Sequence, residues 1–107
     1  MLAYIQGQAS GMVDLKIVLS SRVREKLADK HGGVTVDEIR QCFANMEKDP
    51  MIDGRAENLT NPVTRWFIAE TDRGRLLKIC YMPYPNKEYF IKTAYEPNAV
   101  EVAIFNG

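Results

Sequence analysis

The stretch RLLKICYMPYPNKEYFIKTAY, residues 75–95, contains two runs of aromatic, β-branched and other apolar residues with a turn between them. Such runs are typical of strands, and the Pro-Tyr-Pro-Asn-Lys loop allows the second run to fold back on the first. The simplest register places Tyr81 opposite Tyr89, and it also sets Lys78 opposite Lys92 because side chains alternate along a strand. The sequence thus predicts an antiparallel hairpin that holds two ammonium groups close together on one face of a sheet.

Segments on both sides of the hairpin predict further strands. TRWFIAET over residues 64–71 predicts a strand that pairs with the hairpin, and LKIVLS over 15–20 predicts a short strand near the N-terminus. The apolar stretch VEVAIF over 100–105 is typical of an edge strand or a docking tail. As an edge strand it can pair with its own copy, so a homodimer is a further expectation.

Two helices are predicted between the first strand and the hairpin. Ser20 or Ser21 can cap a helix that runs to about Lys30. Thr35 and Glu38 form a T-x-x-E capping box, which marks the start of the second helix. The order of elements indicates an α+β domain: a short N-terminal strand, two helices, and then a three- to four-stranded antiparallel meander with both helices on one face.

Alternation along the predicted strands divides their side chains between two faces. The face that the helices should cover carries Trp66, Ile68, Leu77, Ile79, Tyr81, Tyr89, Ile91 and Thr93. The other face combines basic, aromatic and small residues, namely Arg65, Phe67, Ala69, Lys78, Cys80, Phe90, Lys92 and Ala94.

The total charge of the 107 residues does not point to a polyanionic partner, because 14 basic and 14 acidic residues cancel. The distribution is uneven, however. Residues 16–30 and 65–92 each have three more bases than acids, whereas residues 35–57 have three more acids than bases. A basic patch is therefore compatible with a neutral protein.

The length predicts one folded domain over residues 13–107, preceded by a flexible extension over 1–12. Cys42 and Cys80 lack the spacing of a metal site, so we expect free thiols, no metal and no cofactor. The first twenty residues lack the pattern of a signal peptide or membrane span. These features favour a cytoplasmic protein without a membrane partner.

Three segments resemble the BrnT toxins, which belong to the RelE-like group of small α+β ribonucleases. The segment EKLADKHGGVTVDEI resembles the helix pair of that family, and WFIAETDRGRLLKICYM resembles its strand, Gly-Arg turn and strand. With FIKTAY the resemblance covers about residues 24–95. It implies the toxin of a type II toxin-antitoxin pair: a metal-free endoribonuclease that acts on RNA, including ribosome-bound mRNA, and is neutralised by a cognate antitoxin protein.

Metal-free RNA cleavage needs a base for the 2′-hydroxyl, cations for the charge on the phosphorane, and an acid for the leaving 5′-oxygen. Tyr95 ends a predicted strand beside Glu96, and a tyrosine with a pKa near 10 can serve only if neighbouring cations lower that pKa. The predicted register places Arg75, Lys78 and Lys92 nearby, with Arg75 or Lys92 as the phosphate clamp. The catalytic candidates are Arg75, Lys92, Tyr95, Glu96 and His31.

The roles of two of these candidates have alternatives. His31 is the only histidine and a possible acid or base, but its place at the end of the first predicted helix also suits a helix-capping cation. The ring of Tyr95 can equally pack beneath the helices with its hydroxyl at the rim.

The predicted open face supplies candidates for RNA binding. Arg65 and Lys78 can contact phosphates, and Phe67 or Phe90 can stack on a base. The alternative is a solvated face on which lysines keep the sheet soluble.

Two other functions remain open from the sequence. One is a non-catalytic domain of the same fold that binds protein or nucleic acid. The other is a small hydrolase of ADP-ribose or a nucleotide, which requires a deep pocket with a carboxylate such as Glu70 or Glu96.

Overall fold

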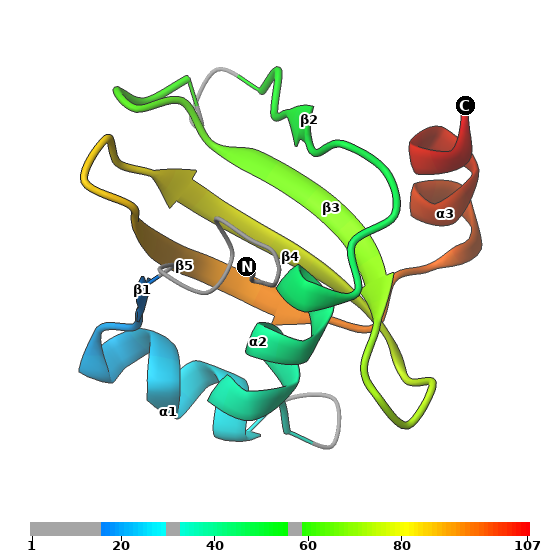
Figure 1. The fold of residues 1–107 in the computed structure, drawn as a ribbon, viewed down its shortest axis with the longest axis horizontal. Coiled ribbons are helices and arrows are strands. Elements are labelled where there is room, and N and C mark those ends of the chain that lie inside the picture. The colour runs from blue at the N-terminus through cyan, green and yellow to red at the C-terminus, as the bar shows by residue number, and fades with distance from the viewer. Residues whose placement is uncertain (1–15, 30–32, 56–58) are drawn as a thin grey trace, which may run out of the picture.

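The computed structural model describes three segments of the chain, residues 16–29, 33–55 and 59–107. The predicted extension over residues 1–12 and both predicted roles of His31 lie outside these segments. The elements follow the order β1, α1, α2, β2, β3, β4, β5 and α3 (Figure 1).

The predicted α+β class and the order of its first elements are confirmed. Helix α1 spans Ser21–Asp29, and the Ser20 hydroxyl accepts a hydrogen bond from the amide of Val23. Helix α2 spans Val36–Ala44 and begins at the predicted Thr35 and Glu38 capping box, in which each side chain bonds the backbone amide of the other residue. Both helices lie on the same face of the sheet (Figure 1).

The sheet has five strands in the order β1-β5-β4-β3-β2. β1 runs parallel to β5, and all other neighbours are antiparallel. The predicted meander β3-β4-β5 therefore gains one strand at each edge. β1 pairs with β5, and β2 pairs with β3. The bounds are β1 Lys16–Val18, β2 Met51–Ile52, β3 Arg65–Glu70, β4 Leu76–Pro83 and β5 Glu88–Tyr95.

The predicted register of the β4–β5 hairpin is wrong. Tyr81 pairs with Ile91, because the turn is tight and closes with a hydrogen bond from the Tyr84 amide to the Glu88 carbonyl. A β-bulge then adds Lys92 as an extra residue, so that Lys78 pairs with Tyr95 and not with Lys92. The sheet consequently does not set the two lysines directly opposite each other.

The predicted faces of β3 are also wrong. Phe67 is fully buried on the α2 side, with its ring centroid 4.8 Å from that of Phe43. Trp66 points to the opposite face, where its ring centroid is 5.6 Å from that of Phe105. Because β3 is buried on both faces, its apolar pattern does not show which side meets α2.

The reason for this double burial is helix α3, Ala99–Asn106, which covers the face opposite α1 and α2 (Figure 1). Of the two alternatives predicted for residues 100–105, the edge strand is wrong, because this segment is a helix that docks on the sheet through Phe105. Asn98 and Glu101 form a second capping box that starts the helix. The helical state also excludes the predicted dimer through strand pairing of residues 100–105.

Candidate functional site

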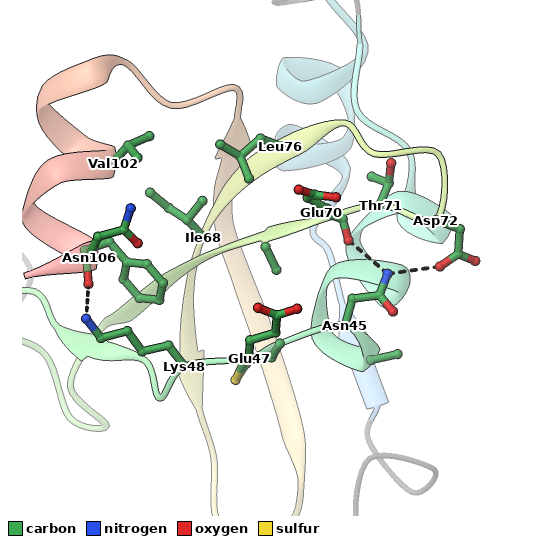
Figure 2. Close-up of a pocket in the computed structure, with 14 residues that line it drawn as sticks. Asn45, Glu47, Lys48, Ile68, Glu70, Thr71, Asp72, Leu76, Val102 and Asn106 are labelled. Carbon is green, nitrogen blue, oxygen red and sulfur yellow. Dashed lines mark hydrogen bonds between the residues drawn. The ribbon is translucent and has the colours of Figure 1, made fainter.

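Two hollows lie beside the sheet, and their charges differ. One of about 850 Å³, which we call the edge groove, lies between the end of α2, the end of β3 and α3 (Figure 2). Its acidic side chains are Glu47, Glu70 and Asp72, and such a lining repels a polyanion. The edge groove is therefore not a candidate RNA site.

The other hollow, which we call the small pocket, has a volume of about 320 Å³. Lys26 of α1 and Arg55 of the β2–β3 loop contribute two cations to its lining, and Tyr95 contributes a phenol. Arg55 is held by Asp53, whose carboxylate lies 2.7 Å from the guanidinium. The small pocket thus combines positive charge with a proton donor.

Tyr95 belongs to a polar cluster between the sheet and α3, formed by Lys78, Tyr95, Glu101 and Trp66 (the Lys78 cluster). The carboxylate of Glu101 receives hydrogen bonds from the Lys78 ammonium at 2.8 Å and from the Tyr95 hydroxyl at 2.5 Å. The Lys78 ammonium also lies 4.5 Å from the ring centroid of Trp66. The β4–β5 pairing fixes this arrangement, because it places Lys78 directly opposite Tyr95.

The surroundings of the Lys78 cluster keep it charged. Burial opposes ionisation of Glu101, but hydrogen bonds from Lys78, Tyr95 and the Asn98 backbone outweigh it and lower its pKa to about 2. Burial likewise opposes the charge on Lys78, yet the bond to Glu101 gives it a net raised pKa. Burial and the bond to Glu101 raise the pKa of Tyr95, so the phenol keeps its proton.

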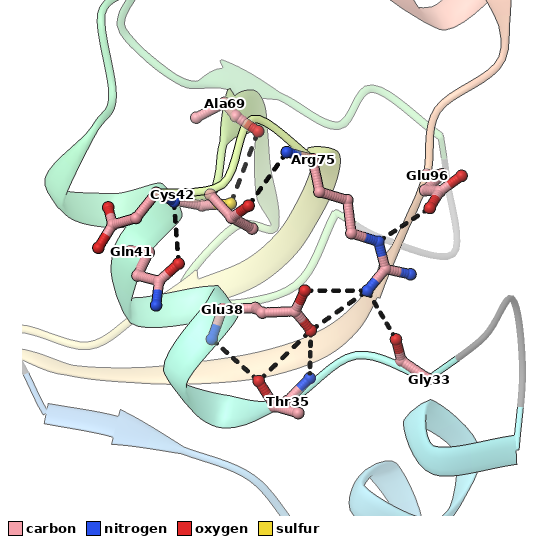
Figure 3. Close-up of polar contacts among 10 residues, drawn as sticks. Gly33, Thr35, Glu38, Gln41, Cys42, Ala69, Arg75 and Glu96 are labelled. Atoms are coloured by element: carbon pink, nitrogen blue, oxygen red, sulfur yellow. Dashed lines mark hydrogen bonds and ion pairs between the residues drawn. The ribbon is translucent and has the colours of Figure 1, made fainter.

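The predicted clamp Arg75 lies in a different cluster, at the start of β4 (Figure 3). Its guanidinium contacts the carboxylates of Glu38 at 3.0 Å and Glu96 at 2.8 Å, and it donates to the carbonyl of Gly33 at 2.8 Å. Burial opposes the charge, but these carboxylates give Arg75 a net raised pKa. Arg75 joins the α1–α2 loop, α2 and the end of β5.

The other predicted residues are distributed around the sheet. The Lys92 ammonium lies 3.5 Å from the hydroxyl of Thr64, and Arg65 is half-buried on β3. Phe90 is half-buried with its ring against Tyr84, at a centroid distance of 4.9 Å. Phe67 is buried beneath α2 and cannot stack on a base, so its predicted binding role is wrong.

The structure thus brings two pairs of predicted residues together, Lys78 with Tyr95 and Arg75 with Glu96, and the two pairs lie in different clusters. Glu101 and Arg55 were not among the predicted site residues. The sequence does contain a signal for Glu101. It lies three residues after Asn98, and this spacing is the pattern of a capping box. No comparable signal marks Arg55, because its place depends on the path of a loop.

Two findings concern the described segments as a whole. No group of three or more histidine, cysteine, aspartate or glutamate side chains in them is arranged to hold a metal ion. No helix in them has the length and hydropathy that a bilayer-spanning helix requires.

Comparisons with known proteins identify a solved structure of similar fold. No protein-family model and no curated protein sequence matches this chain. Among solved structures, the 1.1 Å crystal structure of the Brucella abortus ribonuclease toxin BrnT matches with a TM-score of 0.56. The match covers 78% of this chain and 97% of that chain, with 13% sequence identity.

The chain has a BrnT-like fold. At this identity the match concerns the fold alone, and at that level it confirms the resemblance found in the sequence. The BrnT-like fold supplies the sheet on which Lys78 and Tyr95 face each other.

Proposed function

We propose that the protein is the toxin of a type II toxin-antitoxin pair and cleaves RNA without a metal ion in the cytoplasm. The observation that carries this proposal is the Lys78 cluster beside a cationic pocket, on a BrnT-like fold. The neighbour of that fold is described as a ribonuclease toxin. A cognate antitoxin and an mRNA substrate, free or ribosome-bound, are part of the proposal.

The small pocket would receive the scissile phosphate. Lys26 and Arg55 would hold its charge, and Lys78 would stabilise the additional charge of the phosphorane. Tyr95, whose raised pKa keeps it protonated, would donate its proton to the leaving 5′-oxygen.

Glu101 would accept the 2′-hydroxyl proton after the phosphate has arrived. In the structure described here its pKa of about 2 makes it a weak base, because Lys78 and Tyr95 both bond to it. A phosphate that takes Lys78 from Glu101 removes a hydrogen bond that lowers this pKa, and burial then raises it. Substrate binding would thereby strengthen the base. Arg75, Lys92, Glu96 and His31 remain predictions, and we assign them no step.

The test is induced expression in bacteria followed by mapping of RNA ends, repeated with purified protein and RNA in EDTA. The wild type should arrest growth and cleave RNA in both settings. Tyr95→Phe and Glu101→Gln should each lower the cleavage rate by about 10²-fold or more, the usual effect of losing an acid or base. Tyr84→Phe is the matched control, because Tyr84 does not line the small pocket and should leave the rate unchanged.

Cleavage that survives both cluster substitutions would refute the assigned roles. Intact RNA in all samples would refute the nuclease. If RNA were then retained by the protein in a gel-shift assay, the non-catalytic binding domain would be the better description. One observation favours this alternative. Lys78 and Tyr95 both donate hydrogen bonds to Glu101 and not to a substrate site.

A further inference from the structure

The outer edge of β3 is only partly covered by its neighbour. β2 pairs with β3 through Trp66 and Arg65 and then ends. In an antiparallel ladder, alternate residues direct both backbone groups to the same neighbouring strand. The amide of Thr71 bonds the carbonyl of Arg75 on the β4 side, and the carbonyl of Thr64 accepts from Asp53 on the β2 side.

This alternation directs the amide and carbonyl of Ile68 to the β2 side, beyond the point where β2 stops. In the described part of the chain, neither group has a hydrogen-bond partner on that side. The next carbonyl that points to the β2 side is that of Glu70, and it accepts a hydrogen bond from the side-chain amide of Asn45 at 2.9 Å. Two backbone donors, the amides of Ile68 and Glu70, and one backbone acceptor, the carbonyl of Ile68, therefore lie between β2 and the side chain of Asn45.

The edge groove opens at this position. Its lining includes four consecutive residues of the chain, 68–71, whose side chains point alternately to the two faces of the sheet. A hollow that touches all four must follow the strand edge. Figure 2 shows the lining side chains on two sides of an elongated hollow, with Asn106 and Lys48 toward one end and Asn45 and Asp72 toward the other. This shape suits an extended chain.

The side chains of the groove define the chemistry of that chain. Glu47 and Glu70 are exposed, and among the described residues neither carboxylate forms a hydrogen bond or ion pair. The ammonium of Lys48, by contrast, donates to the carbonyl of Phe105. Apolar surface from Leu76 and from Val102 and Phe105 of α3 lies between the charged groups.

We propose that the edge groove binds an extended segment of a partner protein that carries lysine or arginine on either side of an aliphatic residue. The segment adds a short strand to β3 through the backbone of Ile68, which is β-augmentation. Its aliphatic side chain packs on Leu76 and Val102, and its cations pair with Glu47 and Glu70. This proposal does not depend on RNA cleavage, because it uses none of the residues of the Lys78 cluster.

The test uses isotope-labelled full-length protein and three peptides of about nine residues, the length of a strand. The first alternates lysine with valine. The second replaces each lysine with glutamate. The third is the first with proline at the central position, which removes a backbone donor. The first peptide should shift the amide resonance of Ile68, slow its hydrogen exchange, and bind at least about tenfold more tightly than either of the others.

Substitutions in the groove complete the test. The double variant Glu47→Gln with Glu70→Gln should bind the first peptide about tenfold more weakly. Glu25→Gln, which alters an exposed carboxylate on α1 outside the groove, should bind it like the wild type.

The proposal fails if the three peptides bind equally, if none binds, or if the shifted resonances lie outside the groove. It also fails if sedimentation shows that the chain dimerises and that the double variant is monomeric, because the occupant would then be a second copy.

Discussion

At the scale of single residues, Arg75 shows how structure can redirect a cation that the sequence assigns to catalysis. The sequence marked it as a phosphate clamp because it was expected near Lys92 and Tyr95. In the structure its guanidinium is largely enclosed, with 23% of the side chain exposed, and it contacts two carboxylates and one carbonyl. A residue that joins three segments in this way should be important for stability.

We expect Arg75→Ala to lower the free energy of unfolding by about 2 kcal/mol, because Glu38 and Glu96 lose hydrogen bonds between charged groups. Urea denaturation followed by circular dichroism measures this change. Arg40→Ala is the control and should cost less than about 0.5 kcal/mol, since Arg40 is exposed and its one ion pair among the described residues is with Asp37 on the helix surface. Equal losses for the two variants would contradict the bridging role.

The low pKa of Glu101 predicts a pH dependence of stability. Its folded pKa of about 2 lies below the ordinary value of 4.5, so ionised Glu101 stabilises the fold above that ordinary value. This contribution, at most about 3 kcal/mol, is lost as the pH falls from 4.5 toward 2. In urea titrations the wild type should lose more stability over this interval than Glu101→Gln. Parallel pH profiles would show that Glu101 is not coupled to Lys78 and Tyr95.

At the scale of elements, the two capping boxes explain which helices the sequence could predict. Thr35 and Glu38 mark the start of a helix with one apolar stripe, so the capping box and the hydrophobic pattern both predicted a helix. Asn98 and Glu101 carry the same signal, but the apolar, β-branched stretch after them is also typical of a strand. α3 is apolar on most sides, and exposed Val100 and Ile104 hide the periodicity that would have marked it as a helix. The bulge at Lys92 had no signal at all, so the register could not be predicted.

The second capping box should control how firmly α3 docks. Asn98→Ala should destabilise the helix by about 1 kcal/mol, because the amide of Glu101 loses its side-chain acceptor. Trp66, the only tryptophan, contacts Phe105, so its fluorescence reports the docking of α3. In the variant the Trp66 signal should change at a lower urea concentration than in the wild type. An unchanged transition would mean that the box does not hold α3.

At the scale of the whole molecule, helices on both faces enclose the sheet, and both cysteines, Cys42 of α2 and Cys80 of β4, are buried between these layers. Burial raises the pKa of Cys42 to about 12 and also raises that of Cys80. The prediction of free, buried thiols is confirmed. The predicted fold class succeeded because local signals specify elements, whereas the faces of β3 and the members of the Lys78 cluster depend on α3, which lies far along the chain.

The enclosed thiols should be chemically inert in the native protein. At about pH 8 a thiol reagent such as DTNB should react with neither cysteine within the time that modifies free cysteine, because the reactive thiolate is suppressed and shielded. Addition of denaturant should expose both thiols, and both should then react with DTNB. Rapid reaction of one thiol without denaturant would show that one helical layer opens readily, and Cys42→Ser and Cys80→Ser would identify which layer it is.

The parallel pairing of β1 with β5 has a consequence for how the protein forms on the ribosome. β1 is the first described strand to be synthesised, and its sheet partner is the last strand. Until β5 has left the exit tunnel, β1 has no neighbour, and the apolar sides of α1 and α2 face an incomplete sheet. Such distant pairing slows folding. The nascent chain therefore passes through a stage of exposed apolar surface, and in that interval proteases or chaperones have their best access to it.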